Sequence, residues 1–95
     1  MSAYIIVDVT IFDKEEYKTY VSLTPAAIEA YGGKFIVRGG KAETLEGDWV
    51  PGRIVVLEFS DADKARSWWD SELYAVAKSI RQRAAKTQMI LVEGV

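Results

Sequence analysis

The chain has 95 residues with a formal net charge of −2, and 49% of the residues are hydrophobic and 27% charged. Such a composition predicts a folded globular chain, which we expect to form a single domain over residues 1–95. The sequence contains neither cysteine nor histidine. Their absence excludes disulfides, thiolate nucleophiles, histidine-dependent triads and the commonest zinc and haem ligands. We therefore expect no metal site and no bound cofactor.

The same composition narrows the set of partners. The acidic balance argues against a nucleic-acid surface, which needs clustered positive charge. No apolar run approaches the about 20 residues of a membrane span, so we expect no membrane partner. The N-terminal stretch MSAYIIVDV has no basic region ahead of its apolar residues. This pattern argues against a signal peptide and predicts a cytoplasmic protein.

The N-terminal third of the chain predicts a strand followed by a helix. Residues 3–12 alternate between two faces that are both mostly apolar, as in a strand that is covered on both sides. Asp13 and Glu16 have the spacing of a capping box, so we expect a helix to begin there. Thr24 and Pro25 predict a break in that helix, with Thr24 as a second N-cap and Pro25 as the first residue of a new piece.

The remainder of the chain predicts three more strands and a second helical stretch. Short runs rich in β-branched and aromatic residues indicate the strands, and Ser or Asp ahead of a helical apolar pattern indicates each helix start. A glycine pair at the end of a strand is typical of a β-bulge. The expected elements are strands at 34–38, 53–59 and 87–93, helical segments beginning at Ser60-Asp61 and Ser71, and a bulge at Gly39-Gly40.

The element order β-α-β-β-α-β predicts an α+β fold of the ferredoxin-like plait type. Its antiparallel sheet has the spatial order 4-1-3-2, and both helices cover the same face. The strands are apolar on both faces, yet the helices cover only one of them. An uncovered apolar sheet face needs a partner, and we expect a second copy of the chain there. The sequence therefore predicts a homodimer formed through the sheet face.

The last helical segment carries an apolar and a basic set of residues. The apolar set is predicted to face the sheet. The basic set is predicted to be a solvated face that interacts favourably with the C-terminal end of the helix dipole. The apolar set is Leu73, Val76, Ala77, Ile80 and Ala84, and the basic set is Lys78, Arg81, Arg83 and Lys86.

Four stretches of the chain are distinctive: YGGKFIVRGG (31–40), LEGDW (45–49), RIVVLEF (53–59) and WWDSELY (68–74). They resemble the domain-of-unknown-function family 1330, within the dimeric α/β-barrel superfamily, and the resemblance covers nearly the whole chain. It implies two plaits packed sheet to sheet, but no particular reaction. Relatives in the superfamily include cofactor-independent monooxygenases, haem-degrading enzymes and small-ring isomerases. The haem branch ligates iron through histidine, which this chain lacks.

Asp8, Arg38 and Glu58 are charges within otherwise apolar predicted strands. In the 4-1-3-2 order these strands are neighbours, and side-chain alternation predicts that the three charges share one face. We expect Arg38 and Glu58 to be buried and paired, with Asp8 close by. One interpretation is a structural ion-pair network at the dimer interface. The other assigns Asp8 and Glu58 as catalytic acid–base groups, with Arg38 binding an anionic substrate.

The aromatic residues suggest where a ligand would bind. Trp68, Trp69 and Tyr74 fall at helical spacing, which is typical of a packed core and also of a cavity wall. With Tyr31, residues Trp68 and Tyr74 are candidate substrate-binding residues in a pocket between helices and sheet. Trp49 lies in a polar turn, where we expect it to pack across the dimer or to cover the pocket mouth.

Two classes of function remain open at this point. One is a protein with a pocket for a small anionic, phenolic or enolic molecule, and its enzymatic form would be a cofactor-independent monooxygenase or isomerase. The other is a non-catalytic structural or interaction dimer. The fold alone does not decide between them, because one fold serves many functions.

Overall fold

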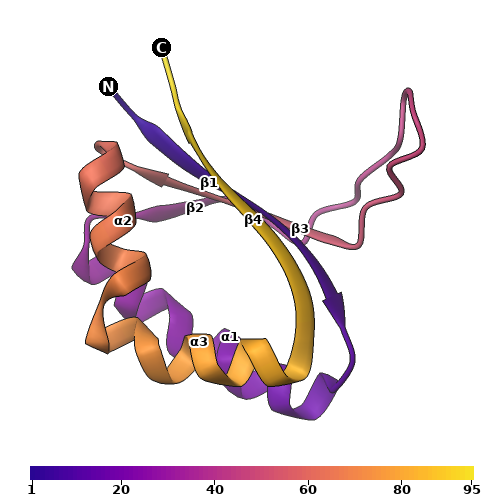
Figure 1. The fold of residues 1–95 in the computed structure, drawn as a ribbon, viewed down its shortest axis with the longest axis horizontal. Helices are drawn as coiled ribbons and strands as arrows, with labels where there is room; N and C mark the ends of the chain where they lie inside the picture. The colour runs from indigo at the N-terminus through magenta and orange to yellow at the C-terminus, as the bar shows by residue number, and fades with distance from the viewer.

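The computed structural model describes residues 1–95 as one antiparallel sheet with three helices on one of its faces (Figure 1). The sheet order is β2-β3-β1-β4, which is the 4-1-3-2 order expected from the sequence. The ferredoxin-like α+β fold is therefore confirmed. The elements are β1 (Ala3–Ile11), α1 (Lys14–Ala30), β2 (Lys34–Arg38), β3 (Arg53–Phe59), α2 (Ala62–Asp70), α3 (Glu72–Ala84) and β4 (Ala85–Glu93).

The central strand β1 shows how the two faces of the sheet differ. Ile5, Val7 and Val9 are buried and belong to the core between the sheet and the helices. The alternate residues Ile6 and Asp8 point to the opposite face and remain partly exposed. The face that carries them has no helix over it, and we call it the bare face. None of the helices is long and apolar enough to cross a membrane.

Short polar side chains begin the three helices. Asp13, Asp61 and Ser71 each accept a hydrogen bond from the backbone N–H three residues further on, at 3.0, 2.8 and 3.1 Å. Each bond satisfies one of the N–H groups that a helix start leaves without a partner. The helix starts expected from the sequence are therefore confirmed.

The predicted break at Thr24 and Pro25 is wrong, because α1 runs through Pro25 without interruption. Pro25 has no N–H, so the carbonyl of Val21 loses its helical partner. Two other groups donate to that carbonyl instead, the hydroxyl of Thr24 and the guanidinium of Arg38, each at 3.3 Å. The helix continues because this carbonyl does not stay unsatisfied.

The β-bulge lies between Phe35 and Val37 and not at Gly39-Gly40, so this prediction is also wrong. The extra residue reverses the alternation of side chains along β2. Arg38 therefore lies on the helix side of the sheet together with Phe35. Its guanidinium carbon is 4.2 Å from the centre of the Phe35 ring.

The predicted inner face of α3 is correct at Ala77 and Ala84, which are buried, and wrong at Leu73 and Val76. Leu73 and Val76 are exposed to 55% and 66%, whereas the buried positions form a neighbouring stripe. In the preceding helix, Trp68 is buried in the core, whereas Trp69 is 41% exposed. The buried residues of α3 are Tyr74, Ala77, Arg81 and Ala84.

The connection between β2 and β3 rises from the bare face, on the side away from the helices (Figure 1). We call residues 39–52 the β2–β3 loop. It carries three exposed apolar side chains, Leu45, Trp49 and Val50. The hydroxyl of Thr44 donates to the carbonyl of Trp49 at 2.7 Å, which braces the loop internally.

Candidate functional site

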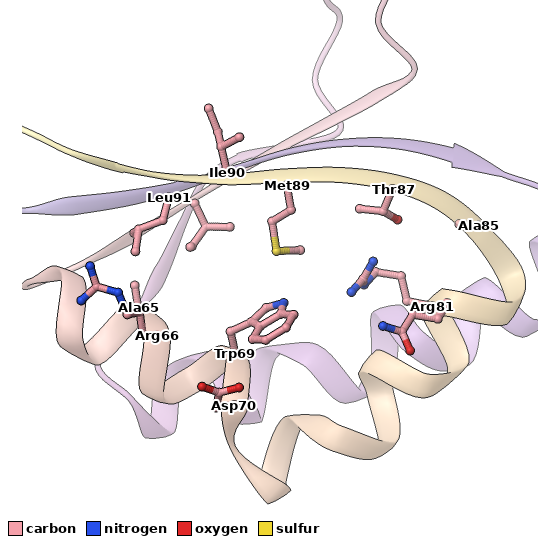
Figure 2. Close-up of a pocket in the computed structure, with 12 residues that line it drawn as sticks. Ala65, Arg66, Trp69, Asp70, Arg81, Ala85, Thr87, Met89, Ile90 and Leu91 are labelled. Carbon is pink, nitrogen blue, oxygen red and sulfur yellow. The ribbon is translucent and has the colours of Figure 1, made fainter.

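A cavity of about 650 Å³ lies between β4 and the helices α2 and α3. In Figure 2 the side chains of Thr87, Met89 and Leu91 point from β4 towards the helices, and Trp69 rises from α2 to meet them. The side chain of Ile90 points to the opposite side of the strand. The volume falls in the range typical of small-molecule pockets.

Arg81 is the charged side chain that α3 places at this cavity. The residue is only 6% exposed, and its Nε donates to the hydroxyl oxygen of Tyr74 at 3.3 Å. All four ion pairs of the structure involve other residues. Arg81 is therefore a buried positive charge without a carboxylate beside it, an arrangement that is costly unless something else compensates the charge.

A pair of hydrogen-bonded tyrosines, Tyr74 and Tyr20, contacts Arg81 through the hydroxyl of Tyr74. The hydroxyls of Tyr74 and Tyr20 are 2.8 Å apart and share a hydrogen bond. Tyr74 is fully buried, and its ring centre is 4.2 Å from that of Trp68. Burial, with a further contribution from Tyr74, raises the pKa of Tyr20 far above its ordinary value, so this phenol stays protonated. The pair holds Arg81 without cancelling its charge.

Two buried polar atoms of cavity-lining residues also lack partners. The hydroxyl of Thr87 and the indole N–H of Trp68 are buried and make no hydrogen bond. Thr87 lines the large cavity, whereas Trp68 lines a smaller one under α1. Buried polar groups in folded proteins are nearly always satisfied, so orphans beside a cavity indicate where a bound molecule would contact the protein.

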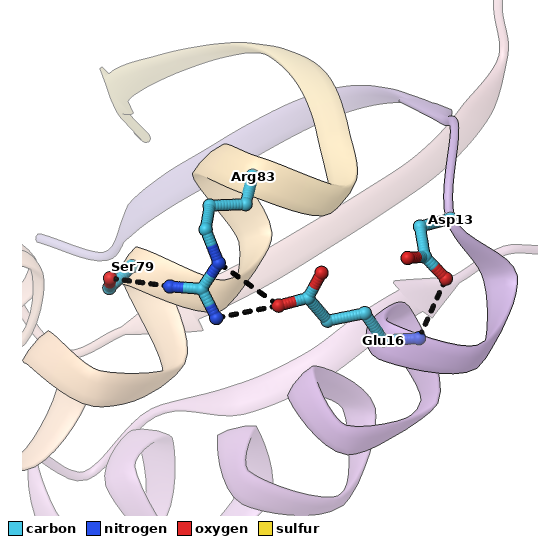
Figure 3. A network of polar contacts seen from close by, with 4 residues as sticks. All are labelled: Asp13, Glu16, Ser79 and Arg83. Atoms are coloured by element: carbon cyan, nitrogen blue, oxygen red, sulfur yellow. Dashed lines mark hydrogen bonds and ion pairs between the residues drawn. The ribbon is translucent and has the colours of Figure 1, made fainter.

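Arg83, two positions from Arg81 on α3, has the opposite environment (Figure 3). Its Nε donates to a carboxylate oxygen of Glu16 at 3.0 Å, and its Nη1 donates to the hydroxyl of Ser79 at 3.2 Å. The Arg83 side chain is 59% exposed. The solvated basic face expected from the sequence is thus correct for Arg83 and wrong for Arg81.

Asp8 does not lie close to Arg38. Its carboxylate is on the bare face, where it accepts hydrogen bonds from the indole N–H of Trp49 at 2.7 Å and the backbone N–H of Gly52 at 2.9 Å. These two bonds tie the β2–β3 loop to the middle of the sheet. Trp49 is therefore fixed to its own sheet, and the outer part of its ring remains exposed.

Glu58 is likewise on the bare face but four residues further along the sheet from Asp8. It lies opposite Tyr4, while Asp8 lies opposite Ile54. Lys34 pairs with Glu58 at 3.3 Å, and the hydroxyl of Tyr4 donates to it at 3.1 Å. Hydrogen bonds from Lys34 and Tyr4 hold the pKa of Glu58 below its ordinary value.

The predicted buried network of Asp8, Arg38 and Glu58 is therefore wrong. The bulge in β2 rotates Arg38 to the helix side, so it and the two acids lie on opposite faces of the sheet. Arg38 is exposed, and it makes no ion pair. Neither acid lines the cavity of Arg81, whose wall contains one carboxylate, that of Asp70.

The predicted aromatic residues have separate positions. Tyr74 contacts Arg81 directly, and Trp68 packs against Tyr74. Tyr31 caps the end of α1 and packs against the core but lines neither cavity. Arg81 and Thr87 were not identified from the sequence. Arg81 could have been found from the spacing of Tyr74, Ala77, Arg81 and Ala84, because these residues form one helical stripe that contains an arginine.

The model of the family described as "Domain of unknown function (DUF1330)" matches residues 2–95, so the chain belongs to this family. No curated protein matches the sequence. The resemblance read from the sequence is thereby confirmed, while the activity of this chain has to be inferred from its own side chains.

The solved structures that resemble the chain include the following three. The RPA0582 protein of unknown function from Rhodopseudomonas palustris is 18% identical, with a TM-score of 0.79 over 99% of this chain and 82% of that chain. SnoaB, a cofactor-independent oxygenase from Streptomyces nogalater, is 13% identical, with a TM-score of 0.68 over 99% and 93%. A dimeric ferredoxin-like protein of unknown function from Jannaschia sp. CCS1 is 8% identical, with a TM-score of 0.73 over 99% and 100%. At these identities the likeness shows a common fold.

Proposed function

We propose that this member of the DUF1330 family is a cytoplasmic homodimer in which each protomer binds a small organic anion between α2, α3 and β4. The ligand class is a carboxylate, phenolate or enolate with an apolar body. The main proposal is that the protein binds such an anion, and an enzymatic reaction on the bound anion is a secondary proposal. It rests mainly on Arg81, a buried cation that no acid of the chain neutralises.

Arg81 supports an anionic ligand for an electrostatic reason. A buried charge is strongly unfavourable in a medium of low dielectric unless an opposite charge or several hydrogen bonds accompany it. Tyr74 supplies one hydrogen-bond acceptor to Nε, which leaves the terminal nitrogens of the guanidinium for a ligand. The guanidinium fork matches a carboxylate or an enolate oxygen, and Thr87, whose hydroxyl has no partner, lines the same cavity.

The rest of the cavity wall favours an apolar, ring-shaped ligand body. Trp69 and Met89 approach from opposite sides, and Leu91 and Ala65 complete an apolar wall beyond them (Figure 2). Aromatic and thioether side chains pack well against ring systems. A benzoate or a phenolate would place its oxygen at Arg81 and its ring against Trp69.

The bare face supports the homodimer. Ile6, Val56 and Ile90 lie side by side across three strands, and no helix covers them. Ile90 and Ile36 are exposed to 56% and 50%. A contiguous apolar area of this kind is typical of an interface between copies of one chain. The Jannaschia protein of the same fold is dimeric, which agrees with this part of the proposal.

A cofactor-independent oxygenase is the enzymatic form of this proposal. SnoaB, which shares the fold, is such an oxygenase, and a buried guanidinium would stabilise a deprotonated phenol or enol. Asp70 is the carboxylate at the cavity. The acid–base role of Asp8 and Glu58 stays a prediction, and it would need a reaction on the bare face. A non-catalytic dimer is the alternative if no compound is turned over.

A thermal-shift screen of small carboxylates and phenols, with benzoate as the first probe, tests the proposal. We expect benzoate to raise the melting temperature of the wild-type protein in a saturable way, because it binds the folded state. Arg81→Gln is expected to abolish the shift. Arg83→Gln removes the same charge two residues away, from an exposed and paired arginine, and is expected to retain it.

Each outcome of the screen has a defined meaning. Loss of the shift in both arginine variants would show that net charge and not the cavity controls binding, and would contradict the proposal. No shift with any carboxylate or phenol at millimolar concentration would favour the non-catalytic structural dimer. Every compound that binds is then assayed for oxygen consumption, which separates an oxygenase from a binding protein.

A further inference from the structure

A second, much smaller cavity lies under α1. Its volume is about 30 Å³, and Arg38, Arg53, Tyr17 and Tyr20 are among the residues that line it. No carboxylate lines it. Met89 borders both cavities, but Arg81 belongs to the large one alone. This pocket therefore has two arginines and no acid.

Arg53 is held inside this pocket by its strand. It lies opposite Val9, so its side chain projects to the helix side of the sheet. Its Nε is buried and makes no hydrogen bond, and Arg53 forms no ion pair. Burial raises the pKa of Tyr17, and the charge of Arg53 opposes that rise, which places the guanidinium close to the phenol.

Gly39 makes room for the Arg53 guanidinium. It has a φ of 71°, a conformation that residues with a side chain rarely adopt. A Cβ atom at this position would also lie 2.6 Å from Cζ of Arg53, which is too close for two carbon atoms. The backbone conformation favours glycine, and a side chain at this position would also displace the Arg53 guanidinium. Because residue 39 has no side chain, the guanidinium of Arg53 can lie directly against the backbone turn at Gly39.

Arg38 stands at the mouth of the same pocket. The bulge in β2 turns it to the helix side, and its guanidinium packs on the face of the Phe35 ring. One of its terminal nitrogens donates to the Val21 carbonyl that Pro25 leaves free. These contacts fix the orientation of the guanidinium, yet Arg38 makes no ion pair either. Its remaining N–H groups are available to a ligand.

We infer that Arg38 and Arg53 form a second anion site, which binds the carboxylate of a small organic acid between α1 and the start of β3. Two guanidinium groups at one pocket repel each other unless an anion lies between them. The pocket has room for about one water molecule, so only a part of the anion enters it. A planar carboxylate meets both conditions, with one oxygen on the exposed Arg38 and the other directed towards the buried Nε of Arg53.

Nuclear magnetic resonance of the ¹⁵N-labelled protein tests this site directly. Acetate is the probe, sodium chloride at equal ionic strength is the reference, and the arginine Nε–H signals are the readout. We expect acetate to move the Arg53 signal in a saturable way that chloride does not reproduce. Arg38→Gln, at an exposed position, is expected to weaken acetate binding about tenfold or more.

Matched variants give the controls. Lys18→Gln removes one positive charge from exposed α1 and is expected to leave the acetate affinity unchanged. Arg81→Gln is also expected to leave the acetate affinity unchanged. The second anion site and the proposed function can therefore each be refuted without the other. Arg53→Lys keeps the charge but loses the planar fork, so weaker binding is expected from a variant that need not disturb the fold.

Three results would overturn the inference. One is the absence of an acetate-specific movement of the Arg53 signal. Another is an equal loss of affinity in Arg38→Gln and Lys18→Gln, which would make the effect one of net charge. The third is tighter binding of inorganic phosphate than of acetate in the wild-type protein, which would replace the carboxylate by a phosphate as the ligand.

Discussion

The two sides of the sheet differ in whether their charged side chains have partners within the chain. On the helix-covered face three arginines, Arg38, Arg53 and Arg81, have no carboxylate partner. On the bare face the acids Asp8 and Glu58 each have two hydrogen-bond donors from the chain itself. Through these bonds Asp8 holds a loop and Glu58 holds the edge strand β2. The arginines without a carboxylate partner are the basis of both proposed anion sites, which lie on the helix side of the sheet.

Truncation of Tyr74 is expected to have the largest effect, because this residue supports the covered face. It is completely buried, packs on Trp68 and bonds to Tyr20 and Arg81. Tyr74→Ala is expected to lower the free energy of unfolding by about 3–5 kcal/mol. Tyr74→Phe keeps the ring and is expected to cost about 1–2 kcal/mol. A Tyr74→Phe variant as stable as wild type in urea denaturation would contradict the role of the hydroxyl, and equal losses in the two variants would contradict the role of the ring.

A charge on the bare face is expected to break the dimer. Ile90→Lys places an ammonium in the centre of the apolar area and would face its copy across a two-fold interface. Light scattering is expected to give the mass of a monomer at micromolar concentration. Val76→Lys introduces the same charge at an equally exposed apolar residue of α3, and this variant is expected to stay dimeric. Monomerisation by both, or a monomeric wild-type protein, would refute the assignment of the interface.

Removal of the Asp8 carboxylate is expected to release the β2–β3 loop. Asp8→Ala deletes the acceptor for Trp49 and Gly52, so we expect faster proteolysis within residues 39–52 and a loss of about 1–2 kcal/mol in stability. Thr44→Ala removes a bond internal to the loop, and a smaller change is expected. Unchanged proteolysis in Asp8→Ala would show that the loop is held in another way.

The smallest effect is expected at Glu58. Its pKa is lowered in the folded state by Lys34 and Tyr4, so its contribution to stability is present above the ordinary carboxyl pKa. That contribution is lost as the pH falls through the lowered pKa of the folded state. Lys34→Gln is therefore expected to melt slightly lower than wild type near neutral pH, and the difference is expected to vanish in acid. A difference in melting temperature that grows in acid would contradict a lowered pKa of Glu58 in the folded state.

The sequence predicted the topology correctly because hydrophobic periodicity and caps are local signals. Asp13, Asp61 and Ser71 begin helices where their side chains predict. The errors at Pro25 and Arg38 have one origin, since both depend on contacts between distant parts of the chain. The Val21 carbonyl accepts from a strand residue, and the bulge in β2 is defined only by its pairing with β3.

Arg81 was missed for a related reason. Leu73, Val76 and Ile80 form one helical stripe, and Tyr74, Ala77 and Arg81 form the adjacent one. Hydropathy favours the first stripe, but the structure buries the second. A charged residue in a buried stripe contradicts the usual pattern of a helix, and such contradictions are expected at binding sites. Periodicity alone cannot separate two stripes that differ by one residue.

The stability of Arg81→Met tests the central claim most directly. If Arg81 is a cation kept for a ligand, its replacement by an apolar side chain of similar length removes an uncompensated buried charge. The ligand-free variant is then expected to be more stable than wild type by at least about 1 kcal/mol in urea denaturation, while benzoate no longer stabilises it. A ligand-free variant that is less stable than wild type, and that still gains stability from benzoate, would contradict the account.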